Sequence, residues 1–120
     1  MEDNIIKNRI LSFKYAFKGA YLLIKKETSI KIHITLAIIA CIMGFYFGIT
    51  KTEWMIQLLT IASVISTEGL NTAVEEIANF MHPEQHSKIG YIKDIAAGAV
   101  FFTALVALII GLIIYLPYLY

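Results

Sequence analysis

The chain has 120 residues, of which 58% are hydrophobic and 16% charged, and its formal net charge is +1. This length suits one domain, but the mean hydropathy is +0.71 and the apolar share exceeds the about 45–50% of ordinary globular proteins. A soluble core of this size could not hide so many apolar side chains, so the composition favours a membrane protein over a soluble domain.

The first segment, residues 5–26, is predicted to form an amphipathic helix. Apolar side chains at helical spacing share one face: Ile6, Ile10, Phe13, Phe17, Ala20 and Ile24. Basic side chains gather on one flank: Lys7, Lys14, Lys18 and Lys25. We expect this helix to lie in the membrane surface, with its basic flank toward anionic headgroups. A helix packed on a partner protein is the alternative interpretation.

Three membrane-spanning helices are expected to follow, over residues 32–49, 54–81 and 95–116. The first is about the minimum length for a span, and its Gly44 and Gly48 have the spacing typical of close helix approach. The fold class predicted is therefore an all-α membrane protein, in which an N-terminal amphipathic surface helix precedes three transmembrane helices. The whole chain, 1–120, forms one domain.

The connections and the orientation also follow from the sequence. We expect a tight turn over residues 50–53, a polar loop over residues 82–92, and an exit from the membrane marked by Pro117 and its neighbouring tyrosines. Seven of the ten basic residues precede position 32, which predicts a cytoplasmic N-terminus. Three crossings then place the 82–92 loop on the cytoplasmic side.

The second expected span carries a stripe of polar side chains, formed by Glu68, Asn71, Glu75 and Asn79. At about 100° per residue these side chains project within roughly 80° of one another. A carboxylate at the bilayer centre costs about 2.5–3.5 kcal/mol, and the sequence shows no obvious basic neighbour for Glu68. A span of about 20 residues from Trp54 places the inner boundary near Ala73, with Glu68 roughly 8 Å beneath it.

Polar residues from three segments are expected to converge on the cytoplasmic face: Glu27, Glu75, Lys93 and Asp94. Carboxylates from two helices can hold Mg²⁺ together with substrate phosphates, and a lysine suits phosphate oxygens. The deeper carboxylate of Glu68 can serve as a general base toward a lipid hydroxyl. Together these parts predict phosphoryl transfer from a nucleotide to a lipid alcohol.

A small transporter or proton-conducting protein that uses Glu68 is the second hypothesis, because intramembrane carboxylates also mark such pathways. A transporter would need polar groups along the whole crossing, whereas the outer halves of the expected spans are apolar. A structural membrane subunit is the third hypothesis, and it leaves the placement of Glu68 and of the Lys93-Asp94 pair unexplained.

Two motifs carry a family resemblance. The segment Glu68-Gly-Leu-Asn-Thr-Ala-Val-Glu75, followed by Lys93-Asp94-Ile-Ala-Ala-Gly-Ala-Val100, resembles the prokaryotic diacylglycerol kinase and undecaprenol kinase family of small membrane lipid kinases. The resemblance implies transfer of the γ-phosphate of ATP to undecaprenol or diacylglycerol, with Mg²⁺ as cofactor. It also implies a homotrimer with shared sites, and an active site on the cytoplasmic side of the bacterial inner membrane. The basic residues of the first helix lie beside three expected spans and are interpreted as membrane-surface charge, so no nucleic-acid partner is expected. The ending Gly111-Leu-Ile-Ile-Tyr-Leu-Pro117 looks like the undecaprenol-using branch.

The resemblance further implies residue roles. Glu68 matches the proton acceptor, and Glu27 and Glu75 match the magnesium ligands. The residues expected to bind ATP are Tyr15, Glu27, Glu75, Glu84, Gln85, His86, Lys93 and Asp94. Those expected to bind the lipid substrate are Arg9, Glu68, Asn71 and Ala97. The sequence departs from the family pattern at Asn79, where many members carry an aspartate, and at Gln85, which replaces an aromatic residue. The pair Ser66-Thr67 is also more polar than the usual aliphatic pair.

Overall fold

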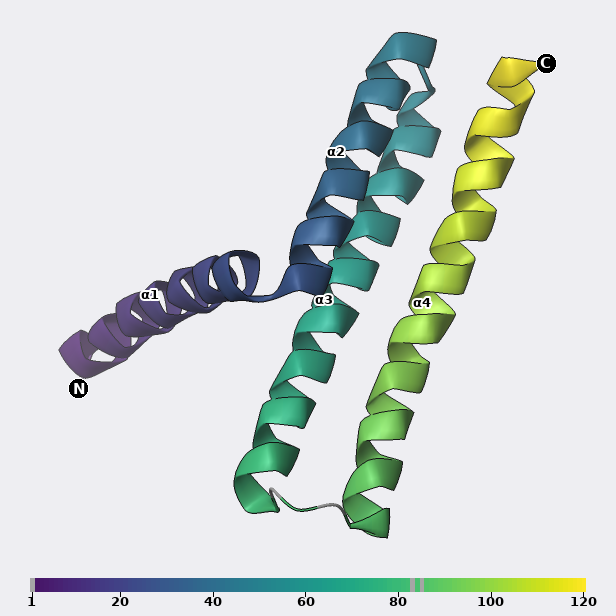
Figure 1. Ribbon diagram of the computed structural model, residues 1–120. Coiled ribbons are helices and arrows are strands. Elements are labelled where there is room, and N and C mark those ends of the chain that lie inside the picture. Colours follow the sequence, from purple (N-terminus) through teal and green to yellow (C-terminus); the bar gives the residue numbers. More distant parts are fainter. Residues whose placement is uncertain (1, 83, 85) are drawn as a thin grey trace.

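The structure is a computed structural model that describes residues 2–82, 84 and 86–120, with side chains from residue 4 onward. This part of the chain forms four α-helices and no strand: α1 (Glu2–Lys26), α2 (Thr28–Phe47), α3 (Lys51–Met81) and α4 (Ser87–Leu119) (Figure 1). The prediction of an all-α chain is confirmed.

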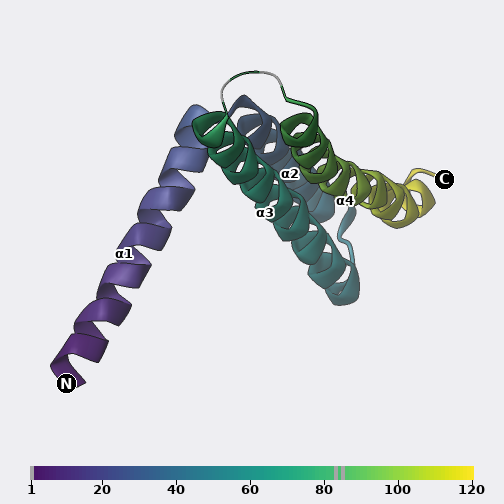
Figure 2. The same cartoon turned by 90° about the horizontal axis from the view of Figure 1, so that it is seen from below.

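The helices α2, α3 and α4 form a bundle in which α3 runs antiparallel to the other two and packs against both (Figure 1). In contrast, α1 leaves the bundle sideways and contacts it only near the α1–α2 junction (Figures 1 and 2). This junction lies well above the α3–α4 loop, so the C-terminal part of α3 and the N-terminal part of α4 extend beyond the level of α1. The chain therefore consists of a three-helix bundle, α2 to α4, and one helix, α1, that projects away from it.

The turn between α2 and α3 is defined by two local signals. Gly48 ends α2 in the left-handed conformation (φ 61°), which favours glycine. Thr50 and Glu53 then form a capping box, in which the Thr50 hydroxyl accepts the N–H of Glu53 and the Glu53 carboxylate accepts the N–H of Thr50. The expected turn over residues 50–53 is therefore wrong beyond Thr50, because residues 51–53 are the first turn of α3.

The second connection is shorter than the expected 82–92 loop. His86 is the N-cap of α4, and its Nδ1 accepts the N–H of Lys88 at 3.1 Å. This cap allows α4 to begin at Ser87, so Lys93 and Asp94 lie on a helix and not beside a loop. At the other end Pro117 does not end the helix, which continues to Leu119. A proline φ near −65° is compatible with a final helical turn.

The bundle is held together most tightly at the end away from the α3–α4 loop. A small core of Ile49, Ile114 and Tyr115 lies there. The Tyr115 hydroxyl donates to the Ala40 carbonyl at 2.8 Å and lies 2.5 Å from the side-chain amide oxygen of Gln57. Because Ala40, Gln57 and Tyr115 belong to three different helices, this polar contact joins α2, α3 and α4 at one point.

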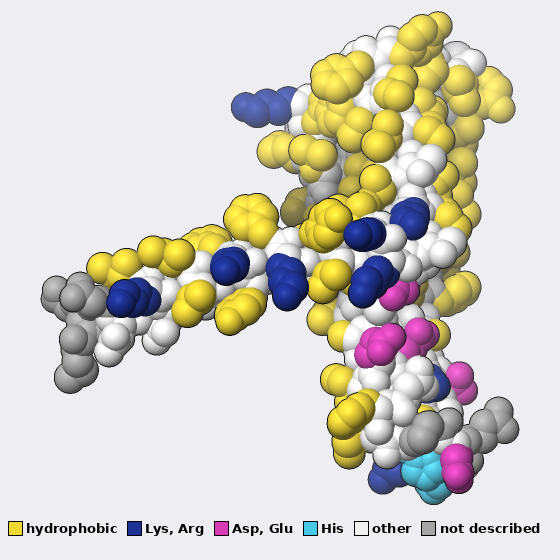
Figure 3. All heavy atoms as spheres, turned by 60° about the vertical axis from the view of Figure 1, so that its left-hand side comes forward, with side chains coloured by type: hydrophobic (Ala, Val, Ile, Leu, Met, Phe, Trp, Pro, Cys, Tyr) yellow, Lys and Arg dark blue, Asp and Glu magenta, His cyan; other side chains and the backbone are white. Residues whose placement is uncertain are grey.

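Apolar side chains cover most of the molecular surface. The folded chain exposes 9345 Å², whereas a compact soluble monomer of this mass exposes about 6,500 Å². Hydrophobic side chains cover the upper bundle and much of α1 (Figure 3). Within the described residues two helices, α2 and α4, are long and apolar enough to cross a membrane. The surface and these helices together indicate a membrane protein.

Candidate active site

The polar stripe of α3 connects this helix to both of its neighbours. Glu68 Oε1 lies 2.9 Å from His33 Nε2 on α2. At the far end of the stripe, Lys93 Nζ on α4 donates to Asn79 Oδ1 at 2.6 Å. Between them, Asn71 Nδ2 donates to Glu75 Oε1 at 3.3 Å. The stripe is therefore a continuous polar face that starts inside the bundle and continues toward the α3–α4 loop.

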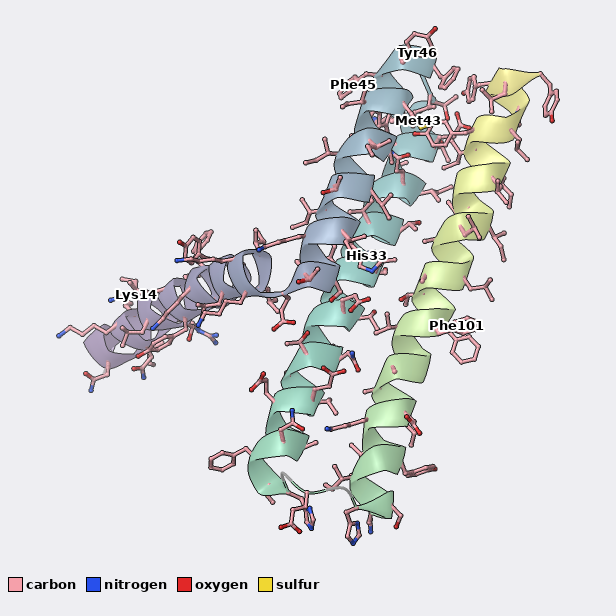
Figure 4. All side chains as sticks on the ribbon, viewed as in Figure 1. Lys14, His33, Met43, Phe45, Tyr46 and Phe101 are labelled. Atoms are coloured by element: carbon pink, nitrogen blue, oxygen red, sulfur yellow. The ribbon has the colours of Figure 1, made fainter. Side chains whose placement is uncertain are left out.

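Glu68 is the most enclosed carboxylate of this stripe, with 9% of the residue exposed. The expectation that it has no basic neighbour is wrong, because His33 points from the first turns of α2 into the bundle and contacts it (Figure 4). A signal for this contact exists in the sequence. His33 and Glu68 lie at similar separations on either side of the α2–α3 turn, and an antiparallel pair brings such residues to the same level.

The N-terminal helix meets the stripe beside Glu68. A Cβ atom added to Gly69 would lie 3.1 Å from Leu23 Cδ1, so the absence of a side chain at Gly69 lets α1 approach α3. Glu27 directly follows α1 and is the N-cap residue of α2, but its side chain makes no capping hydrogen bond. Its carboxylate, half-buried at the junction, is thus not used to stabilise the helix end.

Charges of opposite sign are segregated around this junction. Lys and Arg side chains line α1 and the junction, and Asp and Glu side chains gather below them on the bundle (Figure 3). Glu75 and Glu76 are both exposed, but they project about 100° apart on α3. Only Glu75 shares the stripe with Glu68 and Asn71, so the exposed Glu76 is a solvated charge outside the stripe.

The expected metal ligands, Glu27 and Glu75, come from two separate elements. Residues 4–82, 84 and 86–120 contain no cluster of three or more His, Cys, Asp or Glu side chains. Mg²⁺ typically takes one or two protein carboxylates and completes its shell with water and substrate phosphates. Beside Glu75, the Oδ1 atom of Asn71 is buried without a hydrogen-bond partner among the described residues. These donors fit a magnesium ion that arrives with a nucleotide.

The other expected nucleotide contacts lie toward the α3–α4 loop. Asp94 is exposed, and it shares one face of α4 with the exposed Ala97, which is expected to bind the lipid substrate. Glu84 is exposed, and its carbonyl accepts a hydrogen bond from His82 Nδ1 at 2.9 Å. His86 uses its Nδ1 to cap α4, which leaves its Nε2 for a ligand. Gln85 lies outside the described residues.

Comparison with known proteins decides the family. The model of the prokaryotic diacylglycerol kinase family matches residues 14–115. The chain belongs to this family.

Several relatives of this kinase family are similar over most of their length. An undecaprenol kinase of Bacillus subtilis is 37% identical over 106 residues, which cover 88% of this chain and 86% of the relative. A diacylglycerol kinase of Haemophilus influenzae is 33% identical over 92 residues, or 77% of this chain and 78% of the relative. A diacylglycerol kinase of Synechocystis is 28% identical over 114 residues, or 94% of this chain and 65% of the relative. The predicted enzyme class, a lipid kinase, is confirmed.

Two residues that the family resemblance assigns to the site are remote from it within one chain. Arg9 and Tyr15 belong to α1. The labelled Lys14 of Figure 4 shows that this part of α1 projects away from the bundle. Arg9 precedes Glu27 by 18 residues, or about 27 Å along a helix. Arg9 also precedes the first residue of the family match. A single chain of this kinase therefore brings together Glu68, Asn71 and Glu75, but not Arg9 and Tyr15.

The sequence analysis missed an apolar groove of about 330 Å³ between α2, α3 and α4. Its walls are mainly Ala, Ile and Leu side chains, with Ala37, Ala104 and Gly111 among them. His33 lies at one end and Gln57 with Tyr115 at the other. Small side chains on facing helices, spaced along α2 and α4, are the sequence signal that indicates such a groove.

Proposed function

We propose that this protein is a membrane lipid kinase that transfers the γ-phosphate of ATP to a lipid hydroxyl, with undecaprenol as the preferred acceptor over diacylglycerol. The observation that carries the proposal is the position of Glu68. Its carboxylate is enclosed in the bundle at the level of the α1–α2 junction, and the polar stripe continues from it toward the α3–α4 loop. A carboxylate at this level can meet a lipid hydroxyl on one side and a water-soluble nucleotide on the other.

Helix lengths support a placement in the membrane. The 20 residues of α2 correspond to about 30 Å, the thickness of the hydrocarbon core. The helices α3 and α4 are longer by 11 and 13 residues, or by about 16–20 Å. We place α1 at the headgroup level, α2 to α4 across the bilayer of the bacterial inner membrane, and the α3–α4 loop in the cytoplasm.

This placement makes α3 a membrane span in addition to α2 and α4, although its second half is polar. The helix α3 crosses in the opposite direction to α2 and α4, the two apolar helices on which it packs. A position twenty residues into α3, near Leu70, is level with the start of α2. The membrane boundary then lies closer to Glu68 than a count from Trp54 suggests, so Glu68 is within one helical turn of the headgroups.

In the proposed reaction the lipid hydroxyl attacks the γ-phosphorus of ATP. Its proton passes to the carboxylate of Glu68, a new oxygen–phosphorus bond forms, the bond from the γ-phosphorus to the bridging oxygen breaks, and ADP leaves. A positioned general base contributes typically 10²–10⁴-fold to such a step. The part of the carboxylate that His33 does not contact, Oε2, is the atom available to accept the proton.

The nucleotide brings several negative charges to a part of the chain rich in carboxylates. We assign Glu27 and Glu75 to hold Mg²⁺, which would neutralise phosphate charge when bound. Lys93 supplies a cation from α4. Because its partner Asn79 is neutral, the hydrogen bond of 2.6 Å leaves the ammonium charge of Lys93 uncompensated and available to a phosphate oxygen. Asp94, Glu84 and His86 are assigned to the remaining nucleotide contacts.

We also propose a homotrimer in which α1 of one subunit serves the site of another. The distance of Arg9 and Tyr15 from Glu68 within one chain supports this arrangement, as does the exposed apolar face of α1. Undecaprenol is the preferred acceptor because the relative with 37% identity carries that name, whereas the diacylglycerol kinases named above are less similar.

The test uses purified protein in lipid nanodiscs with labelled ATP, Mg²⁺ and either undecaprenol or diacylglycerol. Wild-type protein should label undecaprenol faster. Glu68→Gln and Glu75→Gln should each lower turnover by at least about 10²-fold, as expected for loss of a base or of a metal ligand. Glu76→Gln is the matched control, since it removes the neighbouring charge from a different face, and it should keep wild-type turnover.

Wild-type turnover in the Glu68→Gln variant would refute the assigned base. ATP consumption that does not depend on an added lipid alcohol, or proton flux across sealed vesicles without lipid phosphorylation, would refute the kinase and favour the transport hypothesis. Removal of Mg²⁺ with a chelator should stop the reaction, and its restoration should recover it.

A further inference from the structure

The contact between His33 and Glu68 takes no part in the proposed transfer of the proton or of the phosphoryl group. Within residues 4–82, 84 and 86–120 it is the one direct contact between a nitrogen of a basic side chain and a carboxylate, and it joins the first turns of α2 to the middle of α3. The His33 ring is half-buried and Glu68 is buried. We propose that His33 is a positioning residue, which donates Nε2–H to Glu68 Oε1 and thereby directs Oε2 toward the lipid hydroxyl. This inference rests on the proposed function.

The neighbouring side chains of α1 and α4 are apolar and cannot orient the carboxylate of Glu68. The neighbouring part of α1 presents Leu23 to Gly69, and the part of α4 that lines the groove with His33 presents Ala104 and Leu108. None of these side chains can hydrogen-bond to a carboxylate. Among the described residues, His33 is therefore the only side chain that fixes the orientation of Glu68.

A free glutamate rotates about three side-chain bonds, and a hydrogen bond to one oxygen restricts that freedom. Misplacement of a reacting group by about 1 Å can cost 10²-fold in rate. The donor itself stands on a helix whose register with α3 is set by the capped turn at Gly48 and Thr50. Two rigid elements thus hold the base, and the hydrogen bond is stronger in this apolar setting than it would be in water.

The experiment compares variants that keep or remove the N–H donor. His33→Leu and His33→Met remove it and place an apolar side chain at this position. His33→Gln retains an N–H donor at a similar distance from the backbone. We expect both apolar variants to lower kcat by about 10–10²-fold, with KM for ATP and lipid within about threefold of wild type. The Gln variant should remain within about fivefold of wild-type kcat.

A double-mutant cycle separates positioning from folding. In a Glu68→Gln background, His33→Leu should cause no further loss of kcat, because the carboxylate that it positions is already absent. Thermal unfolding in detergent identifies variants that fail to fold, and His33→Met replaces His33→Leu if the latter does. Equal losses in the folded Gln and Leu variants, or wild-type kcat in either apolar variant, would overturn the inference.

The same measurements separate this inference from the proposed function. If wild-type protein phosphorylates neither lipid, the proposed function fails. If Glu68→Gln is fully active, the kinase assignment stands, but Glu68 is not the base and the role of His33 fails with it. If Glu68→Gln is inactive while folded His33→Leu and His33→Met keep wild-type kcat, the kinase assignment stands and the role of His33 is wrong.

Discussion

Glu53 stabilises the start of α3 through two different hydrogen-bond partners. Its carboxylate completes the capping box with Thr50 and accepts a hydrogen bond from the Tyr118 hydroxyl at 2.6 Å. The bond from Tyr118, and after it the backbone N–H of Thr50, hold the pKa of Glu53 below its ordinary value of 4.5. The same bond raises the pKa of Tyr118. The Glu53 side chain thus joins the start of α3 to the end of α4.

The lowered pKa of Glu53 predicts a pH dependence of stability. A carboxylate whose pKa is depressed by folding stabilises the fold above its ordinary pKa, and that stabilisation is lost as the pH falls through the folded value. We expect wild-type protein to unfold at a higher temperature than Glu53→Gln at pH 7, and the difference to shrink below pH 4.5. The effect should be small because the group is partly exposed. A difference in unfolding temperature that stays constant from pH 7 to 3 would contradict this explanation.

Tyr115 offers a stronger residue-scale prediction. Its hydroxyl bridges Ala40 and Gln57, and Gln57 is 5% exposed. Tyr115→Phe should destabilise the protein by about 1–2 kcal/mol, because it leaves the buried amide oxygen of Gln57 without its hydrogen-bond donor. The double variant Tyr115→Phe with Gln57→Leu should recover part of the loss, since both polar groups are then gone. Denaturation in mixed micelles measures both, and an additive loss would contradict the proposed coupling.

At the scale of helices, close packing depends on where small residues lie. Gly44 and Gly48 share a motif, but only Gly44 serves close approach, since a Cβ atom there would lie 2.7 Å from Trp54 Cζ2. Gly48 instead provides the left-handed end of α2. The spacing of two glycines therefore predicted one contact correctly and assigned the second residue to the wrong role.

This difference can be tested with paired alanine substitutions. Gly44→Ala forces the Trp54 ring or the α2–α3 turn to shift, which should cost about 1–3 kcal/mol of stability. Gly98→Ala is the matched control in α4, because a Cβ atom there meets nothing within 4 Å. The control should be neutral or stabilising by up to about 1 kcal/mol, from higher helix propensity. Equal unfolding temperatures of the two variants would contradict the close-approach role of Gly44.

For the whole molecule, the central question is how α1 relates to the bundle. Within one chain α1 touches the bundle only at its C-terminal end, and its apolar side chains remain exposed. A membrane surface can cover that face, but it cannot bring Arg9 to Glu68. A cyclic assembly can do both, because α1 of each subunit then reaches the next.

A mixing experiment tests this shared site. Arg9→Ala and Glu68→Gln should each be inactive alone, since each lacks one part of every site. When the two are co-expressed in equal amounts, about one quarter of the sites in a cyclic trimer receive both intact parts. Lipid phosphorylation should therefore recover to about that fraction of wild type. Activity no higher than the sum of the single variants would argue for sites built within one chain.

Much of this architecture follows from the sequence because it depends on local pattern. Helical periodicity in the sequence predicts that Ile6 and Phe13 lie on the same apolar face of α1. The positions of the charged residues distinguish the apolar helices α2 and α4 from the second half of α3, which is polar. The stripe of Glu68, Asn71 and Glu75 needs only the helical repeat. The family also follows, since its motifs are contiguous in the chain.

The tertiary structure alone decided how these faces meet. The contacts of His33 with Glu68, of Leu23 with Gly69 and of Lys93 with Asn79 each join residues of different helices. Periodicity says which side chains share a face but not which neighbouring face lies opposite, nor at what level. Those relations depend on the register that the capped turns and the packing of three helices impose together, and this register determines the surroundings of the buried carboxylate.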